Sequence, residues 1–285
     1  MTGGARVRGQ FIDGPWGQLA AVIFTPPPDV SARFCVLHIP AAFEEMNKSR
    51  RMVALQARAF AAAGGCTVVF DPTGTGDSAG EHADATWARW RVDTMAAWAF
   101  MRDEFAMPPL LWGLRLGALL GSSVAADPHV SPSALLLWQP VASGATFFNQ
   151  FMRLASAPDA KNRSGSSDIK ALRAMLAAGQ PVEVAGYELH PDLVAGCVAT
   201  ELGTVAVPGC PVIWRESSPD TSPETSPWAA NIAQRWQRSG AHVDLQAVRG
   251  PSFWASAEPE ESPALIAATT DAVTRHVDSA LVATR

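Results

Sequence analysis

Short, wholly apolar runs recur along much of the chain. Four of them show no polar alternation, and each is bounded by proline or glycine on at least one side: Arg33–Ile39, Thr67–Phe70, Leu110–Trp112 and Ala134–Trp138. Unbroken apolar runs of this length are typical of parallel strands that are buried on both faces. They therefore predict the centre of a parallel sheet.

Helical patterns separate these runs. Between Thr86 and Phe105, large apolar residues recur every three or four positions, which predicts one buried face of a helix. Arg51–Ala63, which ends at a Gly-Gly pair, and the small apolar segment Gly117–Ala126 predict two further helices. Strands and helices thus alternate, an order that favours right-handed crossovers and a mostly parallel sheet with helices on both faces.

Both ends of the chain extend this pattern. Val7–Ile12 and Gln18–Thr25 flank a short turn and predict a hairpin. Near the other end, Pro211–Arg215 and a segment around Val243–Val248 predict two more strands. Each of these is followed by a predicted helix, around Ala229–Ser239 and from about Pro263 to Leu281.

The middle of the chain lacks the strand rhythm. The phenylalanines from Phe147 to Phe151 and the segment Ile169–Ala178 predict two helices, and the polar stretch Ser156–Ser167 predicts a loop between them. We interpret residues 141–207 as a helical cap inserted into an α/β core. That core would consist of residues 1–140 and 208–285.

Composition excludes several classes of protein. The chain has 285 residues, of which 48% are hydrophobic and 17% charged, so it is not a disordered protein. The net charge is −5, and no basic stripe suggests a nucleic-acid partner. No apolar run reaches the roughly 20 residues of a membrane span, and the first ten residues lack a signal-peptide pattern. We therefore expect a cytoplasmic protein with a small-molecule ligand, and the oligomeric state stays open.

The cysteines do not suggest a metal site. Cys35, Cys66, Cys197 and Cys210 form no C-x-x-C pair, and none lies near a histidine at metal-ligand spacing. We expect them to be buried thiols. The phosphate-loop and dinucleotide-binding motifs are also missing. The sequence therefore predicts no metal and no cofactor.

The most informative motif follows the predicted strand Leu110–Trp112. A G-x-S-x-G turn between a strand and a helix presents the nucleophile of an α/β-hydrolase, because its two glycines permit the sharp turn. Here the frame is Gly113-Leu114-Arg115-Leu116-Gly117, with Arg115 in the central position. A D-x-x-G-x-G-x-S loop from Asp71 to Ser78 follows the preceding strand. In a parallel sheet, ligands bind beyond the carboxyl ends of the strands, where both loops lie.

Six segments together resemble a known family. They are HIPAAFEEMNKSRRM, FDPTGTGDSAG, LLWGLRLGALL, LLLWQPVASGATFFNQFMRL, QPVEVAGYELHPDL and GPSFWASAEPEESPAL. Over about Val36 to Ala268 the chain is similar to the second hydrolase associated with exosortase-A systems, in the α/β-hydrolase superfamily. The resemblance implies an α/β-hydrolase fold with an inserted helical cap, and hydrolysis of an ester or acyl bond. It also implies a link to exopolysaccharide and protein-sorting loci of Gram-negative bacteria.

The chain departs from the superfamily pattern at two of the three triad positions. Arg115 has no hydroxyl or thiol and stays protonated, so it cannot form an acyl-enzyme. The turn after the last predicted strand, Arg249–Trp254, lacks the histidine that normally stands there. Glu216 and Asp220, near the usual position of the triad acid, are then expected to be surface carboxylates. The chain is either a hydrolase with a non-standard site or a catalytically silent protein that binds an anionic ligand or a protein partner.

Three charged residues are the catalytic candidates. Arg115 either pairs with Glu44, Glu45 or Asp71, or receives an anionic ligand at a helix N-terminus. Glu44 and Glu45, expected on the loop before a first helix that begins near Asn47, either form ion pairs or include a general base. Such a base could activate water while Arg115 stabilises the oxyanion. If both carboxylates are held in ion pairs, the catalytic hypothesis weakens.

Residues around the same strand ends complete the predicted site. We expect His38, Phe43, Asn47, Leu114, Leu116 and Ser78 to line the substrate pocket. For His38, a structural histidine bonded to backbone is the alternative. Ser78 either shapes the glycine-rich loop or substitutes for the missing nucleophile.

Overall fold

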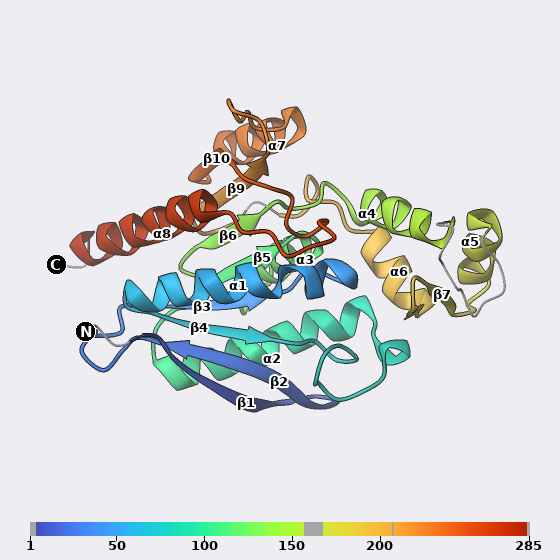
Figure 1. Ribbon diagram of the computed structural model, residues 1–285, viewed down its shortest axis with the longest axis horizontal. Coiled ribbons are helices and arrows are strands. Elements are labelled where there is room, and N and C mark those ends of the chain that lie inside the picture. Colours follow the sequence, from blue (N-terminus) through green and yellow to red (C-terminus); the bar gives the residue numbers. More distant parts are fainter. Residues whose placement is uncertain (1–3, 157–167, 207, 284–285) are drawn as a thin grey trace.

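The computed structural model describes residues 4–156, 168–206 and 208–283, and its main feature is an eight-stranded sheet (Figure 1). The strand order is β1-β2-β4-β3-β5-β6-β9-β10, antiparallel from β1 to β4 and parallel from there on. The strands are β1 (Arg6–Gly14), β2 (Gly17–Thr25), β3 (Phe34–Ile39), β4 (Gly65–Phe70), β5 (Leu110–Leu114), β6 (Leu135–Trp138), β9 (Val212–Ser218) and β10 (Val243–Arg249). Each predicted strand is thus confirmed. The four central strands β3 to β6 are almost entirely buried, as their apolar runs predict.

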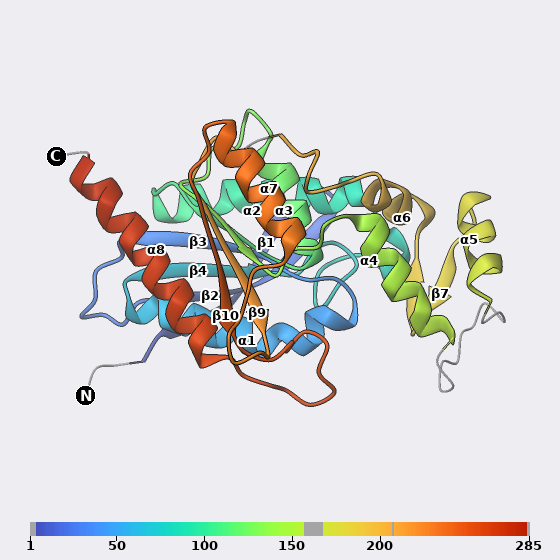
Figure 2. The ribbon, with the colours of Figure 1, turned by 90° about the horizontal axis from the view of Figure 1, so that it is seen from above.

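Helices cover both faces of this sheet (Figure 2). One face carries α1 (Glu44–Ala62) and α8 (Pro263–Ala283), whose residues Phe60 and Val273 share one apolar core. The other face carries α2 (Trp87–Phe105), α3 (Leu116–Ala125) and α7 (Pro227–Arg238), which contribute to a second core. The predicted fold class, a mostly parallel sheet between two helical layers, is confirmed.

The segment between β6 and β9 lies beyond the carboxyl ends of the central strands (Figure 1). It contains α4 (Gly144–Phe151), η2 (Met152–Ser156), α5 (Ile169–Ala177), the hairpin β7 (Val182–Val184) and β8 (Tyr187–Leu189), and α6 (Pro191–Val198). Its described residues contribute no strand to the main sheet. The division into core and cap stays a prediction, and residues 157–167 of the predicted polar loop lie outside the described residues. The sequence did not predict β7 or β8, because strands of three residues leave no periodic pattern, and it did not predict α6.

An aromatic cluster joins this segment to the core. The Phe43 ring stacks on Phe151 at 4.4 Å and meets the Tyr187 ring edge-on at 5.4 Å, between ring centroids. It also lies 6.0 Å from the rings of Phe147 and Phe148. Phe43 follows β3 and immediately precedes α1, so the cluster links the segment between β6 and β9 to the start of that helix.

Helix α1 begins earlier than the sequence predicts. The expectation that Glu44 and Glu45 lie on a loop is wrong, because both belong to the first turn of α1. Phe43 turns the chain abruptly into the helix at φ 57° and ψ −134°. Two acidic side chains in the first turn also complement the positive end of the helix dipole. The two carboxylates are therefore presented on a rigid element.

Candidate functional site

The turn between β5 and α3 has the sharp geometry that its glycines predict. Arg115 stands at its apex with φ 55° and ψ −117°. A Cβ atom on Gly117 would lie 2.2 Å from the Pro40 carbonyl oxygen, and one on Gly113 would lie 2.3 Å from the Ala118 Cα. Only glycine allows this close approach of strand, turn and helix. The apex side chain is thereby held at the carboxyl end of a central strand.

Backbone strain is concentrated around this apex. Five non-glycine residues of the described chain have positive φ, and three of them follow neighbouring strands. They are Phe43 after β3, Arg115 after β5 and Gln139 after β6, the last with φ 41°. Such conformations cost about 1–3 kcal/mol each and are found most often at functional sites. The strain makes this edge of the sheet the candidate functional site.

Arg115 forms a two-pronged ion pair with Glu45. Its Nε lies 3.2 Å from both carboxylate oxygens, and its Nη2 lies 3.1 Å from Oε1. Nη1 donates to the Gln139 carbonyl at 3.4 Å, and the guanidinium lies 5.3 Å from the ring centroid of Trp254. The two charged side chains are only 13% and 17% exposed. Of the three partners considered from the sequence, Glu45 is the one that pairs with Arg115.

Two opposing effects act on the Glu45 carboxylate. Burial raises its pKa, and the neighbouring Arg115 charge and hydrogen bonds lower it. Burial dominates, so the pKa of Glu45 lies above the ordinary glutamate value. This carboxylate consequently binds a proton more tightly than a free glutamate does, although it faces a guanidinium.

Glu44 is held more loosely than Glu45. Its carboxylate lies 3.5 Å from the Lys48 Nζ, and the side chains are 38% and 29% exposed. An exposed pair one helical turn apart contributes little to stability. Both carboxylates thus have a cationic partner, and only the Glu45 pair is well shielded from solvent.

The turn after β10 closes the site from the other side. It supplies Trp254, which packs against the Arg115 guanidinium. Glu216, near the end of β9, accepts hydrogen bonds from the Ser226 backbone at 2.6 Å and the Ser226 hydroxyl at 2.7 Å. It is 4% exposed, so the expectation of a surface carboxylate is wrong for Glu216, which stabilises the start of α7. Asp220 is exposed and accepts from the Ser218 hydroxyl.

Solved structures with the same architecture match nearly the whole length of the chain. Est1E from Butyrivibrio proteoclasticus, in a structure with ferulic acid bound, matches with a TM-score of 0.63 and 18% identity over 96% of this chain and 98% of that one. The chain has the α/β-hydrolase fold. An α/β serine hydrolase without a lid from Xanthomonas campestris matches with a TM-score of 0.55 and 16% identity over 96% of this chain and 94% of that one. Mouse α/β hydrolase domain-containing protein 10 matches with a TM-score of 0.61 and 16% identity over 95% and 99%. No protein-family model matches the chain, and neither does any curated protein.

In the α/β-hydrolase fold the apex of the β5–α3 turn presents the nucleophile. Arg115 occupies that apex here. Because an arginine side chain has no nucleophilic oxygen or sulfur, the turn cannot support an acyl-enzyme at this position. The turn after the last strand, where the fold carries its histidine, holds Gly250-Pro251-Ser252-Phe253-Trp254. Trp254, from this turn, and Arg115, from the turn after β5, thus lie in contact, 5.3 Å apart from guanidinium to ring centroid.

The residues predicted to line a substrate pocket are dispersed around the hydrolase fold. Phe43 lies in the aromatic cluster, and Asn47 donates to the Tyr187 hydroxyl at 3.4 Å. Leu116 is 1% exposed and borders a cavity of about 10 Å³ beneath the turn, which is too small for an organic ligand. His38 and Leu114 line a separate cavity on the α1 face. Their role as substrate contacts stays a prediction.

Ser78 is occupied by backbone. Its hydroxyl accepts from the Ala20 N–H at 2.8 Å and donates to the Asp71 carbonyl at 2.5 Å. The first bond attaches the glycine-rich loop to β2, and the second ties the end of the loop to its own start after β4. Of the two alternatives for Ser78, the geometry supports the residue that shapes the loop, because the hydroxyl hydrogen is already used.

Sequence reasoning missed two residues of this site, Gln139 and Trp254. Gln139 directly follows β6, and its side-chain oxygen accepts from the Ser217 N–H at 2.7 Å. Its position at a strand end was the available signal. Trp254 was visible only as one residue of a turn that lacks histidine.

The cysteine, histidine and carboxylate side chains of the described residues form no metal centre. In the described part of the chain, no group of three or more His, Cys, Asp or Glu residues is placed to hold a metal ion. Cys35, Cys66 and Cys197 are buried thiols, as predicted, and Cys210 is half-buried. Burial raises the pKa of Cys66 and Cys210 to about 11, so both are protonated at neutral pH. Among the described helices, none is long and apolar enough to cross a membrane.

Proposed function

We propose that the protein hydrolyses ester or acyl bonds by direct attack of water, with Glu45 as the general base and Arg115 as the stabiliser of the oxyanion. The observation that carries the proposal is the shielded, two-pronged Glu45–Arg115 pair at the strained apex. A purely structural ion pair would gain nothing from a positive φ at Arg115. The strained backbone instead supports a side chain that must point into the site.

The electrostatics of the pair suit such a step. When Glu45 takes a proton from water, it loses its negative charge. At the same moment the attacked carbonyl becomes an oxyanion. Arg115 therefore stabilises the oxyanion as the carboxylate loses its charge, so its positive charge is never left without an anionic partner. Oxyanion stabilisation in a water-poor site is worth far more than the same contact in water.

Arg115 has donors to spare for a carbonyl oxygen. A guanidinium has five N–H hydrogens. Within the described chain, its acceptors Glu45 and Gln139 use one hydrogen on each of the three nitrogens. Two N–H groups are thus left for a substrate oxygen.

The reaction is balanced without an outside reactant. Glu45 accepts one proton from water as the water oxygen bonds to the carbonyl carbon. Collapse of the tetrahedral intermediate breaks the bond to the leaving oxygen, which takes the proton back from Glu45. The products are a carboxylic acid and an alcohol, and Glu45 is a carboxylate again.

The finer assignment concerns the biological substrate. We propose an acylated substrate connected with exopolysaccharide and exosortase systems. The six motif segments that resemble the exosortase-associated hydrolase support this. The aromatic rings around Phe43 and the ferulic acid bound to the Est1E structure suggest aryl acids and aryl esters as the first compounds to test.

A second function is favoured by one specific observation, which is that both candidate carboxylates already have cationic partners. On this account the protein is catalytically silent, and Arg115 binds an anionic ligand or a protein partner through its two remaining N–H groups. Such a protein needs no general base, and it would bind carboxylates without hydrolysing esters.

One experiment separates the two functions. Wild-type protein, Glu45→Gln and Arg115→Ala are assayed on short-chain aryl esters, with Glu44→Gln as the matched control on the same helix turn. Hydrolysis requires a drop of about 10²–10⁴ in kcat for Glu45→Gln and of about 10²–10³ for Arg115→Ala, with little change in the control. A burst of product equal to the enzyme concentration would indicate a covalent nucleophile and refute direct water attack. No turnover, together with carboxylate binding that Arg115→Ala abolishes, would establish the silent protein.

A further inference from the structure

Strand β1 forms one edge of the sheet (Figure 1), and no other strand of the described chain pairs with its outer side. Alternate residues of an edge strand leave their backbone N–H and C=O groups unpaired, so a further strand can add there. Proteins usually protect such an edge with charged residues or proline. The central residues of β1, Gly9-Gln10-Phe11-Ile12, include neither. This edge is therefore open to strand addition.

The folded chain itself does not require a glycine at position 9. Gly9 has no positive φ, and a Cβ atom built on it would lie more than 4 Å from every residue beyond its two neighbours. A glycine inside a strand costs about 0.5–1 kcal/mol relative to alanine, and it often marks a place where another backbone approaches closely. Phe11, two residues further along the same face, is 56% exposed. Strand β1 thus carries an open space and an exposed ring side by side.

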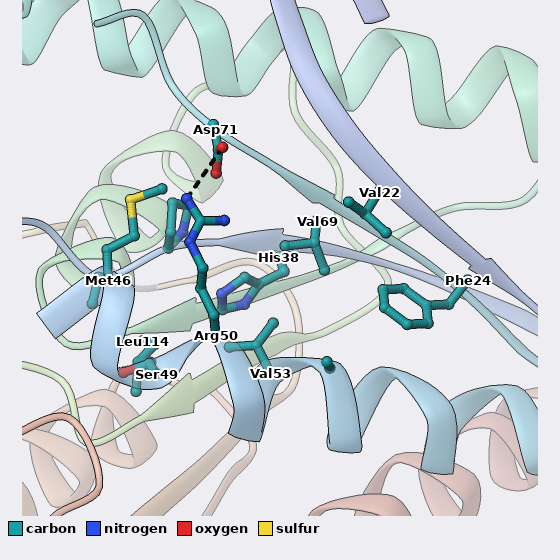
Figure 3. Close-up of a pocket in the computed structure, with 13 residues that line it drawn as sticks. Val22, Phe24, His38, Met46, Ser49, Arg50, Val53, Val69, Asp71 and Leu114 are labelled. Carbon is teal, nitrogen blue, oxygen red and sulfur yellow. Dashed lines mark hydrogen bonds and ion pairs between the residues drawn. The ribbon is translucent and has the colours of Figure 1, made fainter. Parts of the chain in front are cut away.

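The space over Gly9 continues into a hollow on the same face of the sheet. The hollow has a volume of about 280 Å³, and Gly9 of β1, Val22 of β2 and Val69 of β4 line it side by side across the strands. Figure 3 shows Val22 and Val69 with the Arg50–Asp71 ion pair near them. Val22 is 40% exposed, so an aromatic ring that enters over Gly9 finds an apolar surface to cover.

Charges of opposite sign stand at the two ends of this face. At one end the exposed Arg58 of α1 lies over the Phe24 ring, 5.5 Å from its centroid, and Phe24 pairs with Val7 of β1. At the other end Asp13 of β1 and Asp77 are exposed, and Asp77 also lines the hollow. Within the described chain, none of these three charged side chains forms an ion pair. A second copy in the antiparallel direction would bring opposite charges together at both ends.

We propose that two copies of the chain associate through β1, antiparallel about a two-fold axis at Gln10, so that one sheet continues into the other. In this register Phe11 of each copy lies opposite Gly9 of the other copy. Opposite residues of antiparallel strands point to the same face, so each ring covers the glycine and enters the hollow beside it. A copy of the same strand makes both contacts at once, because positions 9 and 11 are equally distant from the axis.

The charges at the two ends match in the same register. Val7 lies opposite Asp13 of the other copy, so the acidic end of one face adjoins the end at which the other copy carries Arg58. The contact is made by two nine-residue strands and one ring from each copy, which places it at the small end of specific interfaces, at about 1,200 Å² or less in total. We therefore expect a weak dimer, with a dissociation constant on the order of 10 μM.

Sedimentation velocity of the full chain between about 1 and 200 μM measures the association. The mass should rise with concentration from that of one chain toward that of two. Phe11→Ser should raise the dissociation constant at least about tenfold, whereas Val198→Ser, which removes a 40% exposed side chain from α6, should leave it unchanged. Because Phe11 is exposed, its replacement should alter neither the circular dichroism spectrum nor the urea midpoint.

A disulfide cross-link tests the register. Gln10→Cys places two thiols opposite each other at the axis, where paired Cα atoms are about 4.5–5.5 Å apart and within disulfide range. Oxidised glutathione should therefore link this variant into dimers on a non-reducing gel. Arg8→Cys is the matched control, because position 8 lies opposite position 12 and the two thiols would be about 13 Å apart. The wild-type chain gives the background from its own cysteines.

A single chain at every concentration would refute the dimer and leave the edge to a strand from a different protein. Association that survives Phe11→Ser would place the interface elsewhere and overturn the proposal. Absence of a cross-link from Gln10→Cys, or an equal one from Arg8→Cys, would refute the register. None of these residues belongs to the Glu45–Arg115 site, so the outcome is independent of the proposed hydrolysis.

Discussion

Removing the Arg115 charge while keeping its backbone strain isolates the value of the ion pair. Arg115→Ala does this, because alanine retains the Cβ atom that makes a positive φ costly. The variant leaves Glu45 shielded, at 17% side-chain exposure, without its cation. Glu45→Gln and the double variant complete a mutant cycle. In the double variant neither charge remains.

The magnitude follows from burial. Breaking a buried ion pair by removing one partner costs about 3–5 kcal/mol, since the other charge is left uncompensated. With exposed fractions of 13% and 17%, the lower end of that range applies, and we expect about 3 kcal/mol for Arg115→Ala at pH 8. The double variant should cost less than the sum of the single variants by about 2 kcal/mol.

The loss of unfolding free energy in Arg115→Ala should also depend on pH, and the direction of this dependence follows from the pKa of Glu45. Burial already raises the pKa of Glu45, and Arg115 opposes that rise. Without Arg115 the pKa rises further above its unfolded value. Folding is then favoured where Glu45 is protonated, and this stability is lost as the pH climbs through the folded pKa. The destabilisation should therefore be smaller at pH 5 than at pH 8.

Urea unfolding of the four proteins at both pH values measures these quantities. An Arg115→Ala penalty that is equal at pH 5 and pH 8 would refute the idea that an unpaired Glu45 carries the cost. Additive single-variant effects would refute the coupling itself.

Three further outcomes test the surrounding framework. Ser78→Ala removes the hydrogen bond that attaches the glycine-rich loop to β2 and the one to the Asp71 carbonyl, so it should lower the unfolding free energy by about 1–2 kcal/mol in urea. A kcat loss comparable to that of Glu45→Gln would restore Ser78 as a nucleophile. Gly117→Ala should abolish soluble folded protein, as judged by circular dichroism, because its methyl group would lie 2.2 Å from the Pro40 carbonyl; a native spectrum would contradict the tight turn. Because the pKa of His38 is lowered to about 3, its ring should remain neutral between about pH 5 and pH 8. Stability from this group is present above the unfolded pKa near 6.5 and falls as the pH drops toward 3, and NMR signals of His38 that titrate near pH 6 would disprove its burial.

The amino-acid sequence predicted the fold and the sharp turn that carries Arg115. Strands that are buried on both faces need no polar alternation, so unbroken apolar runs such as Ala134–Trp138 predicted the central strands. The spacing of Gly113 and Gly117 located the sharp turn, and the identity of Arg115 excluded an acyl-enzyme there. These features depend on local chemistry, which a sequence displays directly.

The tertiary structure decided which side chains meet. Glu44 and Glu45 are adjacent and chemically alike, yet successive helix residues point about 100° apart. Only the entry of the chain into α1 at Phe43 determines that Glu45 faces Arg115 and Glu44 faces Lys48. In the same way, His38 turned out to line the cavity beneath α1, because the face of a strand that opens onto a pocket is set by what packs on it. Orientation and partnership depend on long-range packing, and no local pattern in the chain encodes them.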